Sequence, residues 1–422
     1  MSIFEIGSAA KSASIQLAAM SSDAKNKALA AIACALKANA AEIFSANKQD
    51  LEEAAALPAP VVKRLTFDEK KLSDVLASIQ SLISLPDPVG IVQKATLLDD
   101  GLELRRISCP IGVIGMVFEA RPDALVQIAT LCLKSGNAVM LKGGKEARRT
   151  NAALASTLIQ AVPEPAGWLS NLETREDVKE MLSLSQFIDL IIPRGSNAFV
   201  QYIMANTSIP VMGHADGICH VYVDAKADVD MAVKIIVDSK TQYVSVCNAT
   251  ETLLVHKDIA PAFLPRAAEA LKARKVRLLG CPIARQYAEM GEASEQDWST
   301  EYLDYVLSVK VVSSIDEAIA HINKYGSAHT DCIVTDDSAA AEHFTSLIKS
   351  ANAFWNCSTR FSDGFRYGLG AEVGISTGKL HARGPVGLDG LCTYKWLLKG
   401  HGDIVADYAS GNKTFKHRPL DK

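Results

Sequence analysis

The chain has 422 residues, of which 48% are hydrophobic and 22% are charged. This length exceeds what a single typical core needs, so we expect two or three domains in one soluble, globular body. A formal net charge of −4 argues against nucleic acid as a main partner, because neutralising phosphates requires a basic surface.

The sequence favours neither a membrane protein nor a secreted one. Its apolar runs are shorter than the roughly 18 residues that a membrane span needs, and its start lacks the basic-then-apolar order of a signal peptide. The nine cysteines are spaced too widely for a zinc finger. We therefore expect a cytoplasmic protein with free thiols and no metal site.

The first 110 residues predict helices followed by a hairpin. Apolar residues recur at helical spacing over residues 20–57 and 66–84, and two prolines and a glycine in SLPDPVG end the helical region. The dipeptide Asp100-Gly101 lies between two strand-like stretches and predicts a β-hairpin at about 92–109. An exposed hairpin of this kind favours pairing with another subunit.

Strands and helices alternate from residue 111 onward. Pro122 is suited to open a helix and Gly136 to end it. The predicted strands cover residues 111–118, 138–142 and 187–194, and the predicted helices cover 122–135, 146–162 and 197–206. This order is typical of a parallel sheet, so we expect a doubly wound, Rossmann-type cofactor domain over residues 1–229, with the hairpin inserted in it.

A second alternating block follows residue 230. It contains the strand-like segments TETLLVH, KVRLLG, YVLSVKVV and HTDCIVT and the helical segment DEAIAHINK. We expect a second α/β domain over residues 230–392. The polar tail over 393–422 is expected to be an arm that packs against the hairpin and serves oligomerisation.

Two glycine-rich segments are candidate phosphate loops. GLGAEVG at 368–374 has one residue too many for a dinucleotide fingerprint, so a plain loop is favoured. AVMLKGGKEA instead joins a strand to a helix, where α/β sheets bind nucleotides. Lys142 can reach ribose or phosphate oxygens, Gly143 and Gly144 allow close backbone approach, and Lys145 favours a 2′-phosphate, hence NADPH. A glycine turn with solvated lysines explains the segment equally well.

Cys247 is the candidate nucleophile. It lies in SVCNATETLLVH, between a helix-like stretch and a strand, whereas Cys132 lies within an apolar helix. A thiol of this kind needs a nearby cation or backbone amides to become reactive. Judged alone, one cysteine among nine is more often structural.

Several polar residues beside turns are candidates for binding an anionic substrate. Arg121, Arg360 and Arg383 are suited to bidentate binding of carboxylate or phosphate, with a surface ion pair as the alternative for each. His214 and Asp216 form either an acid–base pair or a hydrogen bond that stabilises a turn.

Four segments closely resemble the gamma-glutamyl phosphate reductase family, also called glutamate-5-semialdehyde dehydrogenases, and the likeness extends over nearly the whole chain. They are VIGMVFEARPDALVQIATLCLKSGNAVMLKGGKEA, IPVMGHADGICHVYVD, SVCNATETLLVH and GLGAEVGISTGKLHARGPVGLDGLCTYKW. The family lies within the aldehyde dehydrogenase superfamily. The resemblance therefore implies an aldehyde dehydrogenase-like α/β fold with a parallel-sheet cofactor domain, a catalytic domain, a bridging hairpin and a site in the cleft between the domains.

The resemblance also implies roles for single residues. Cys247 matches the superfamily's nucleophile, and Lys142 matches the lysine that contacts the adenosine ribose. Glu301 matches the glutamate that holds the nicotinamide ribose, and Gly195 and Ser196 fall near the turn beside the pyrophosphate.

Two departures from the superfamily pattern stand out. The oxyanion-hole asparagine before a proline is replaced by Ala120, so the backbone N–H of Cys247 and a donor such as Asn248 would serve instead. His214 or its neighbours occupy the region of the water-activating glutamate, which suits an enzyme that must not hydrolyse its thioester.

The reaction implied is reduction of gamma-glutamyl phosphate by NADPH to glutamate 5-semialdehyde, through a thioester on Cys247, in proline biosynthesis. Arg121, Arg360 and Arg383, with His214 and Asp216, would bind the substrate. A homodimer or higher homo-oligomer is expected, as is a transient contact with glutamate 5-kinase. The alternatives are a CoA-acylating or general NAD(P)-dependent aldehyde dehydrogenase, and an inactive scaffold on the same fold.

Overall fold

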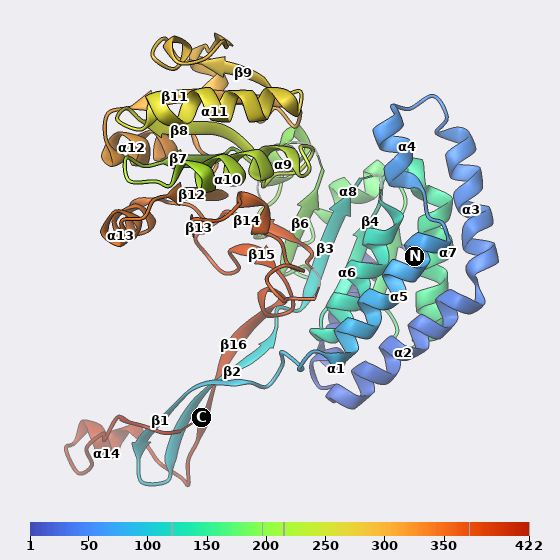
Figure 1. Ribbon diagram of the computed structural model, residues 1–422. Helices are drawn as coiled ribbons and strands as arrows, with labels where there is room; N and C mark the ends of the chain where they lie inside the picture. The colour runs from blue at the N-terminus through green and yellow to red at the C-terminus, as the bar shows by residue number, and fades with distance from the viewer. Residues whose placement is uncertain (120, 196, 214–215, 371, 422) are drawn as a thin grey trace.

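The computed structural model describes residues 1–119, 121–195, 197–213, 216–370 and 372–421, without the side chains of residues 59 and 60. Figure 1 shows two α/β bodies and an arm that projects away from both of them. The N-terminus lies on the first body and the C-terminus lies on the arm. Each body contains a parallel sheet, so the α/β class and the parallel sheet that the sequence predicted for the first domain are both present.

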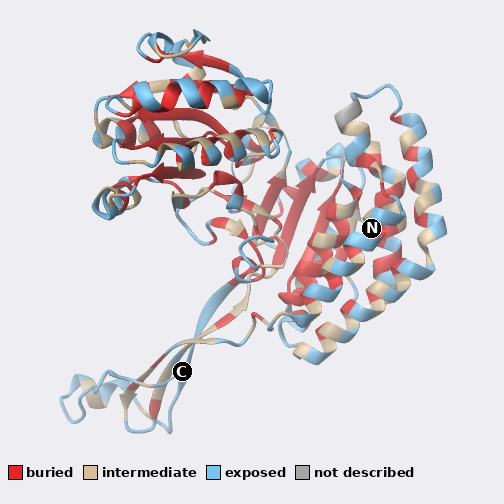
Figure 2. Ribbon diagram, in the orientation of Figure 1, coloured by how far each residue is buried: buried red, intermediate tan, exposed pale blue. Residues whose placement is uncertain are grey.

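The first body is built around a four-stranded parallel sheet of order β5-β4-β3-β6. Its strands are β3 (Val113–Phe118), β4 (Ala138–Lys142), β5 (Leu169–Leu172) and β6 (Leu190–Arg194). Every residue of the two central strands is buried, which Figure 2 shows as continuous red ribbons. Strands covered by helices on both faces need continuous apolar runs, and this accounts for the sequences VIGMVF and AVMLK.

Helices enclose this sheet in layers. Next to one face lie α6 (Pro122–Lys134) and α7 (Arg148–Ala161), which are covered in turn by α2 (Ser22–Ala38), α3 (Ala40–Glu53) and α5 (Glu69–Ser84). The sheet also contacts α1 (Ile3–Ala18), which packs beside α8 (Arg175–Met181). The remaining helices here are α4 (Ala59–Leu65) and α9 (Asn197–Ala205).

The stretch expected to be helical over residues 20–57 is two helices, because α2 and α3 meet at an angle of 66° around Asn39. Within the part of the chain that the structure describes, no single helix is long and apolar enough to span a membrane, although this bent pair passes the same test as a unit.

The second body contains a seven-stranded parallel sheet of order β10-β9-β11-β8-β7-β12-β13. Its strands are β7 (Cys219–Val223), β8 (Thr250–His256), β9 (Arg277–Gly280), β10 (Gly291–Glu292), β11 (Val306–Val312), β12 (Thr330–Val334) and β13 (Asn352–Trp355). Two separate apolar cores lie on its two faces, one with α10 (Val229–Thr241) and α11 (Ala260–Ala273), the other with α12 (Ile315–Tyr325) and α13 (Ser338–Leu347).

The expected domain extents differ from the structure at two places, while the arm begins at Cys392, next to the expected start at residue 393. Strand β7 pairs with β8 and β12, so the second body begins before residue 219. At the other end, Val373, Val386 and Leu391 pack into the core of the first body, next to the short strands β14 (Gly374–Ser376) and β15 (Gly384–Val386). Strands and helices alternate in the same way before and after residue 219. The sequence pattern therefore does not show where the chain leaves the first sheet and enters the second.

The arm is an antiparallel sheet of order β16-β2-β1-β17. Its strands are β1 (Val92–Asp99), β2 (Leu102–Pro110), β16 (Cys392–Lys399) and β17 (Arg418–Pro419), and α14 (Val405–Ala409) lies beside them. The hairpin turns at Gly101, whose φ of +77° favours glycine. The polar tail does lie along the hairpin, because β16 pairs with β2 over its whole length. Most residues of β16 are exposed, as the pale blue arm in Figure 2 shows.

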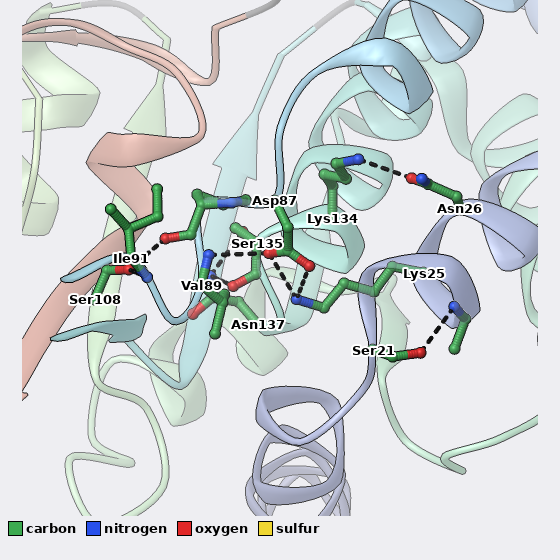
Figure 3. Close-up of polar contacts among 12 residues, drawn as sticks. Ser21, Lys25, Asn26, Asp87, Val89, Ile91, Ser108, Lys134, Ser135 and Asn137 are labelled. Carbon is green, nitrogen blue, oxygen red and sulfur yellow. Dashed lines mark hydrogen bonds and ion pairs between the residues drawn. The ribbon is translucent and has the colours of Figure 1, made fainter. Parts of the chain in front are cut away.

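Buried polar contacts fasten the root of the arm to the first body. The ammonium group of Lys25 on α2 is completely buried and lies 3.0 Å from Asp87, in the linker that leads to β1. Asp87 also accepts a hydrogen bond from the N–H of Val89, and the hydroxyl of Ser108 on β2 donates to the carbonyl of Pro88. Figure 3 shows these contacts converging where the linker passes α2 and α6.

Candidate active site

Cys247 lies in a cavity between the two bodies. The loop that carries it joins α10 to β8, and its side chain is partly exposed. The cavity has a volume of about 260 Å³ and is lined from the first body by the end of β6 and by residues 373–375. The second body contributes residues 245–247, Glu301 and Leu303. A cysteine in this position is reachable by a substrate held in the cleft.

Strand β7 supports the main chain of Cys247 from behind. The thiol of Cys219 donates to the carbonyl of Cys247 at 3.2 Å and lies 3.6 Å from Nδ1 of His329. Gly217 packs so closely that an added Cβ would lie 2.1 Å from the same carbonyl oxygen. Only glycine fits at position 217, and its close contact with the Cys247 carbonyl fixes the position of the loop that carries the cysteine.

Glu301 lines the same cavity as Cys247. Its Oε1 accepts a hydrogen bond of 2.9 Å from the N–H of Gly217. Two residues later, the carbonyl of Leu303 accepts a bond of 3.3 Å from the hydroxyl of Ser245. The segment 301–303 is therefore joined to the cysteine loop as well as to Gly217.

Arg194, at the carboxyl end of β6, also lines this cavity, and the sequence argument missed it. Burial lowers the pKa of its guanidinium, while the nearby carboxylate of Glu372 and the sulfur of Cys247 oppose that shift. Arginine keeps its proton in proteins, so a cation faces the sulfur. The sequence could have identified Arg194 from its place directly before Gly195, at the end of a predicted buried strand.

Arg360 and Arg383, which the sequence predicted as further substrate-binding arginines, have different surroundings. Arg360 is 8% exposed, and its Nε donates to Oε1 of Gln242 at 2.9 Å. Burial and the charge of Arg366 lower the pKa of Arg360, while Asp363 and Cys247 act in the opposite direction. Arg383 donates to the carbonyl of Lys349, and like Arg360 it lines neither this cavity nor the one beside it. The structure therefore places neither Arg360 nor Arg383 on the walls of these two cavities.

The side chain of Asn248 is not placed as an oxyanion donor. It is buried, and its amide nitrogen donates to the carbonyl of Ser362 at 2.7 Å. Asn248 does not line the cavity, although it adjoins Cys247 in the chain. A residue next to the nucleophile in sequence faces the opposite way when the loop is tightly packed, and sequence alone does not reveal this.

Asp216 accepts a hydrogen bond from the amide of Asn197, which is itself a cavity residue that the sequence argument missed. The Oδ1 atom of Asn197 is buried and has no hydrogen-bond partner among the residues that the structure describes. Ser196 and His214, which were expected to take part in the site, lie outside the described residues, and so does Ala120.

A second cavity of about 430 Å³ adjoins the first, and Arg194 and Glu372 line both. Its wall carries charges of both signs. Arg121 and Asp123 come from the start of α6, and Asp74 comes from α5. Asp123 is paired with Lys71 at 2.9 Å. A cavity lined by both cations and anions suits a zwitterionic ligand.

A third, larger cavity of about 830 Å³ lies at the carboxyl ends of β3 and β4, the position at which parallel sheets bind nucleotides. Lys142 at the end of β4 is 9% exposed, and burial lowers its pKa while Glu146 opposes the shift. Gly144 and Lys145 also line the cavity, together with Arg175 of α8, which the sequence argument missed.

The two glycines at the end of β4 are closely packed against neighbouring side chains of the protein. At Gly143 an added Cβ would lie 2.1 Å from Nδ2 of Asn151 on α7, so the strand passes the helix too closely for any side chain. At Gly144 it would strike Glu146. The position of the crevice, with Lys142 and Gly144 on its wall, fits a dinucleotide. Among the described residues, no group of three or more His, Cys, Asp or Glu side chains could hold a metal ion.

Comparison with known proteins supplies an independent view of the chain. A family model described as the aldehyde dehydrogenase family matches residues 3–291. The chain is 60% identical to the gamma-glutamyl phosphate reductase of Acetivibrio thermocellus, over 100% of this chain and 99% of that one. It is 52% identical to the enzyme of the same name from Nostoc punctiforme, over 100% of each chain.

Solved structures agree with this result. The crystal structure of gamma-glutamyl phosphate reductase from Thermotoga maritima matches with a TM-score of 0.93 at 39% identity, covering 95% of this chain and 99% of that one. An acetylating aldehyde dehydrogenase from Geobacillus thermoglucosidasius matches with a TM-score of 0.66 at 18% identity, covering 95% and 97% of the two chains. At that identity the second likeness shows a common fold.

Proposed function

This chain belongs to the aldehyde dehydrogenase family, among its gamma-glutamyl phosphate reductases, and from this premise we propose that it reduces gamma-glutamyl phosphate to glutamate 5-semialdehyde with NADPH in proline biosynthesis. The observation that carries the proposal is the cavity between the bodies, which Cys247, Glu301 and Arg194 line together. This cavity therefore brings together a nucleophile, a carboxylate suited to a ribose and a cation suited to a phosphate.

In the first step the sulfur of Cys247 bonds to the acyl carbon as the bond from that carbon to the phosphate oxygen breaks. A thioester and inorganic phosphate result, and the phosphate takes up the thiol proton. Phosphate leaves readily, so an acidic side chain is not required. Arg194, which lines the cavity, would hold the negative charge of the phosphate as it departs.

In the second step the thioester is reduced. NADPH, when bound, supplies the hydride that adds to the thioester carbon. The resulting tetrahedral oxyanion expels the sulfur and releases glutamate 5-semialdehyde, and the Cys247 thiolate then takes a proton from solvent to restore the thiol. Because the amide of Asn248 bonds to Ser362, we assign the developing oxyanion to the backbone N–H of Cys247.

The amino-acid end of the substrate carries an ammonium and a carboxylate. We place it in the second cavity, where Asp74 would face the ammonium and Arg121 the carboxylate. Because this cavity meets the first at Arg194 and Glu372, the acyl carbon would reach Cys247. Arg383 is not part of this assignment.

The cofactor would lie across the third cavity. Lys142 would contact the adenosine ribose, and Gly143 and Gly144 would allow the backbone to approach it. Gly195 would lie beside the pyrophosphate, and Glu301 would hold the nicotinamide ribose. A 2′-phosphate would meet the cations of Lys145 and Arg175, which is why NADPH is proposed.

The reverse reaction tests the proposal directly. Purified protein should form reduced cofactor from glutamate 5-semialdehyde and NADP⁺ only when phosphate is present. Cys247→Ala should abolish this reaction while NADPH still binds, as measured by nicotinamide fluorescence. Formation of reduced cofactor by the alanine variant would refute the covalent route.

Other outcomes of this assay favour the rival functions. A requirement for CoA in place of phosphate would indicate an acylating dehydrogenase, and reaction with neither would indicate a general aldehyde oxidiser. Absence of cofactor binding would indicate an inactive scaffold. A cytoplasmic location and a transient contact with glutamate 5-kinase, which would protect a labile acyl phosphate, stay predictions.

A further inference from the structure

A fully buried ion pair lies behind the loop that carries Glu301. Nζ of Lys240, near the end of α10, is 2.6 Å from Oε2 of Glu251 on β8, and neither side chain has exposed surface. Burial lowers the pKa of Lys240 and raises that of Glu251 to about 7. Such a pair is seldom more stabilising than apolar residues of similar size, so its presence needs another reason.

The second carboxylate oxygen of Glu251 supports the main chain of Leu303. Oε1 accepts a hydrogen bond of 3.2 Å from the N–H of Leu303. Leu303 has a φ of +52°, a left-handed conformation that is unfavourable for residues other than glycine. The carbonyl of the same residue accepts a bond from Ser245, two residues before Cys247. A strained residue is thus held from both sides.

The rest of the segment is anchored as well. The carboxylate of Glu301 accepts the N–H of Gly217, and the hydroxyl of Tyr302 donates to Asp297 at 2.6 Å. The ring centre of Tyr302 lies 6.0 Å from Nζ of Lys240. The buried pair therefore contacts two consecutive residues of the 301–303 segment, while Glu301 and Leu303 line the Cys247 cavity.

We propose that Lys240 and Glu251 are positioning residues, which hold segment 301–303 in the shape that Glu301 needs to bind the nicotinamide ribose. Glu251 acts through the main chain of Leu303 and touches neither the substrate nor the cofactor. The lysine fixes the carboxylate so that Oε1 stays on the Leu303 side. The inference rests on the proposed function in taking NADPH as the ligand.

Two double variants separate positioning from stability. K240M/E251Q and K240M/E251L both remove the buried charges and keep side chains of similar size. Only the glutamine retains an oxygen that accepts the N–H of Leu303. The dissociation constant for NADPH is measured by fluorescence in a Cys247→Ala background, where no reaction intervenes.

The glutamine double variant should bind NADPH within about threefold of its parent, and the leucine double variant about tenfold more weakly or worse. In chains that retain Cys247, the KM for cofactor should rise for the leucine variant while the KM for semialdehyde changes little. Equal affinity of the two double variants for NADPH would overturn the inference.

Single E251Q provides a second comparison, in case a double variant does not fold. It leaves Lys240 without a partner charge but keeps the acceptor for Leu303, so its melting temperature should fall while NADPH affinity stays near that of the parent. A parallel loss of affinity would mean that the pair has only a structural role.

The chain offers a matched control in the first body. Lys25 and Asp87 form another buried ion pair, far along the chain from the site (Figure 3). K25M/D87N should leave the NADPH dissociation constant unchanged, whatever its effect on stability. If the parent protein itself fails to bind NADPH, it is the proposed function that fails, and this outcome is distinct from equal affinities among the variants.

Discussion

Arg194 is the residue on which the two cavities of the site converge, and its charge faces Cys247. Arg194→Lys retains the charge but loses the bidentate geometry suited to phosphate. In the reverse assay, the KM for phosphate should rise roughly tenfold or more, in line with the loss of one charge-assisted hydrogen bond. Arg383→Lys is the matched control and should change this KM less than about twofold, because Arg383 lines neither cavity.

Arg175 is the residue through which α8 would favour NADPH over NADH. It lines the cofactor cavity together with Lys145. Arg175→Ala should weaken NADPH binding roughly tenfold and leave NADH binding nearly unchanged, because only NADPH carries a 2′-phosphate. The ratio of the two dissociation constants is the measurement, and an equal loss for both cofactors would exclude this role.

His321 makes the stability of the second body depend on pH. It is 4% exposed, and burial lowers its pKa to about 2, with His220 and Lys310 as further causes. Below about pH 6.5 the imidazole of His321 binds a proton in the unfolded chain, whereas in the folded chain it stays neutral. The stability is therefore complete above that pH and falls by about 1.4 kcal/mol per pH unit as the pH drops from there towards 2.

His321→Phe keeps ring packing against Trp298 and Tyr325 and removes the titrating group. The free energy of unfolding of this variant should depend less steeply on pH below about 6 than that of the parent, by one proton. Urea unfolding at two pH values on either side of 6.5 measures this. Identical slopes would show that His321 does not control the acid response.

Sequence motifs identified those single residues whose role requires one particular kind of side chain. Cys247, Lys142 and Glu301 were predicted as site residues, and each of them lines a cavity. Their roles stay predictions. Turn residues alone said nothing about direction, so Asn248 was assigned to the site although its amide is bound to Ser362. Arg194 was missed because a cation at the end of a buried strand has no motif of its own.

Among the elements, β3 and β4 were predicted because strands buried on both faces are continuously apolar. The edge strand β5 was missed, since its two central residues are only partly buried and polar. Helix α1 was also missed, although Ser2 and Glu5 form a capping box that the spacing S-x-x-E indicates.

The contact between α2 and the linker before β1 gives an element-scale prediction. Asp87→Ala would leave the ammonium of Lys25 buried without a counter-charge. The free energy of unfolding should fall by about 3 kcal/mol or more, because an isolated buried charge is costly. Urea denaturation measures the loss, and K25M/D87L should recover most of it. If the double variant is no more stable than Asp87→Ala, the desolvation of Lys25 is not the cause.

For the whole molecule, the arm is the surface through which we expect copies of the chain to associate. Tyr394, Trp396, Leu397 and Leu398 on β16 are each about half exposed, and successive residues of a strand face opposite sides. Apolar side chains on both faces of a projecting sheet favour a protein partner, and we predict a second copy.

Leu398→Glu should therefore shift the protein towards monomers, as sedimentation velocity would show. Leu347→Glu is a control, because that exposed leucine lies at the end of α13, away from the arm. A parent protein that sediments as a monomer would contradict the prediction.

The core of the first body draws on both ends of the chain, because residues 373–391 complete it after the chain has passed through the second body. The arm likewise joins β1 and β2 to β16 and β17, which are synthesised almost 300 residues later. During translation the first body must therefore stay incomplete, with part of its apolar core uncovered, until residues 373–391 have been synthesised. The strands of the second body all lie within residues 219–355, so we predict that a premature stop after them would release a folded second body attached to an incomplete first one.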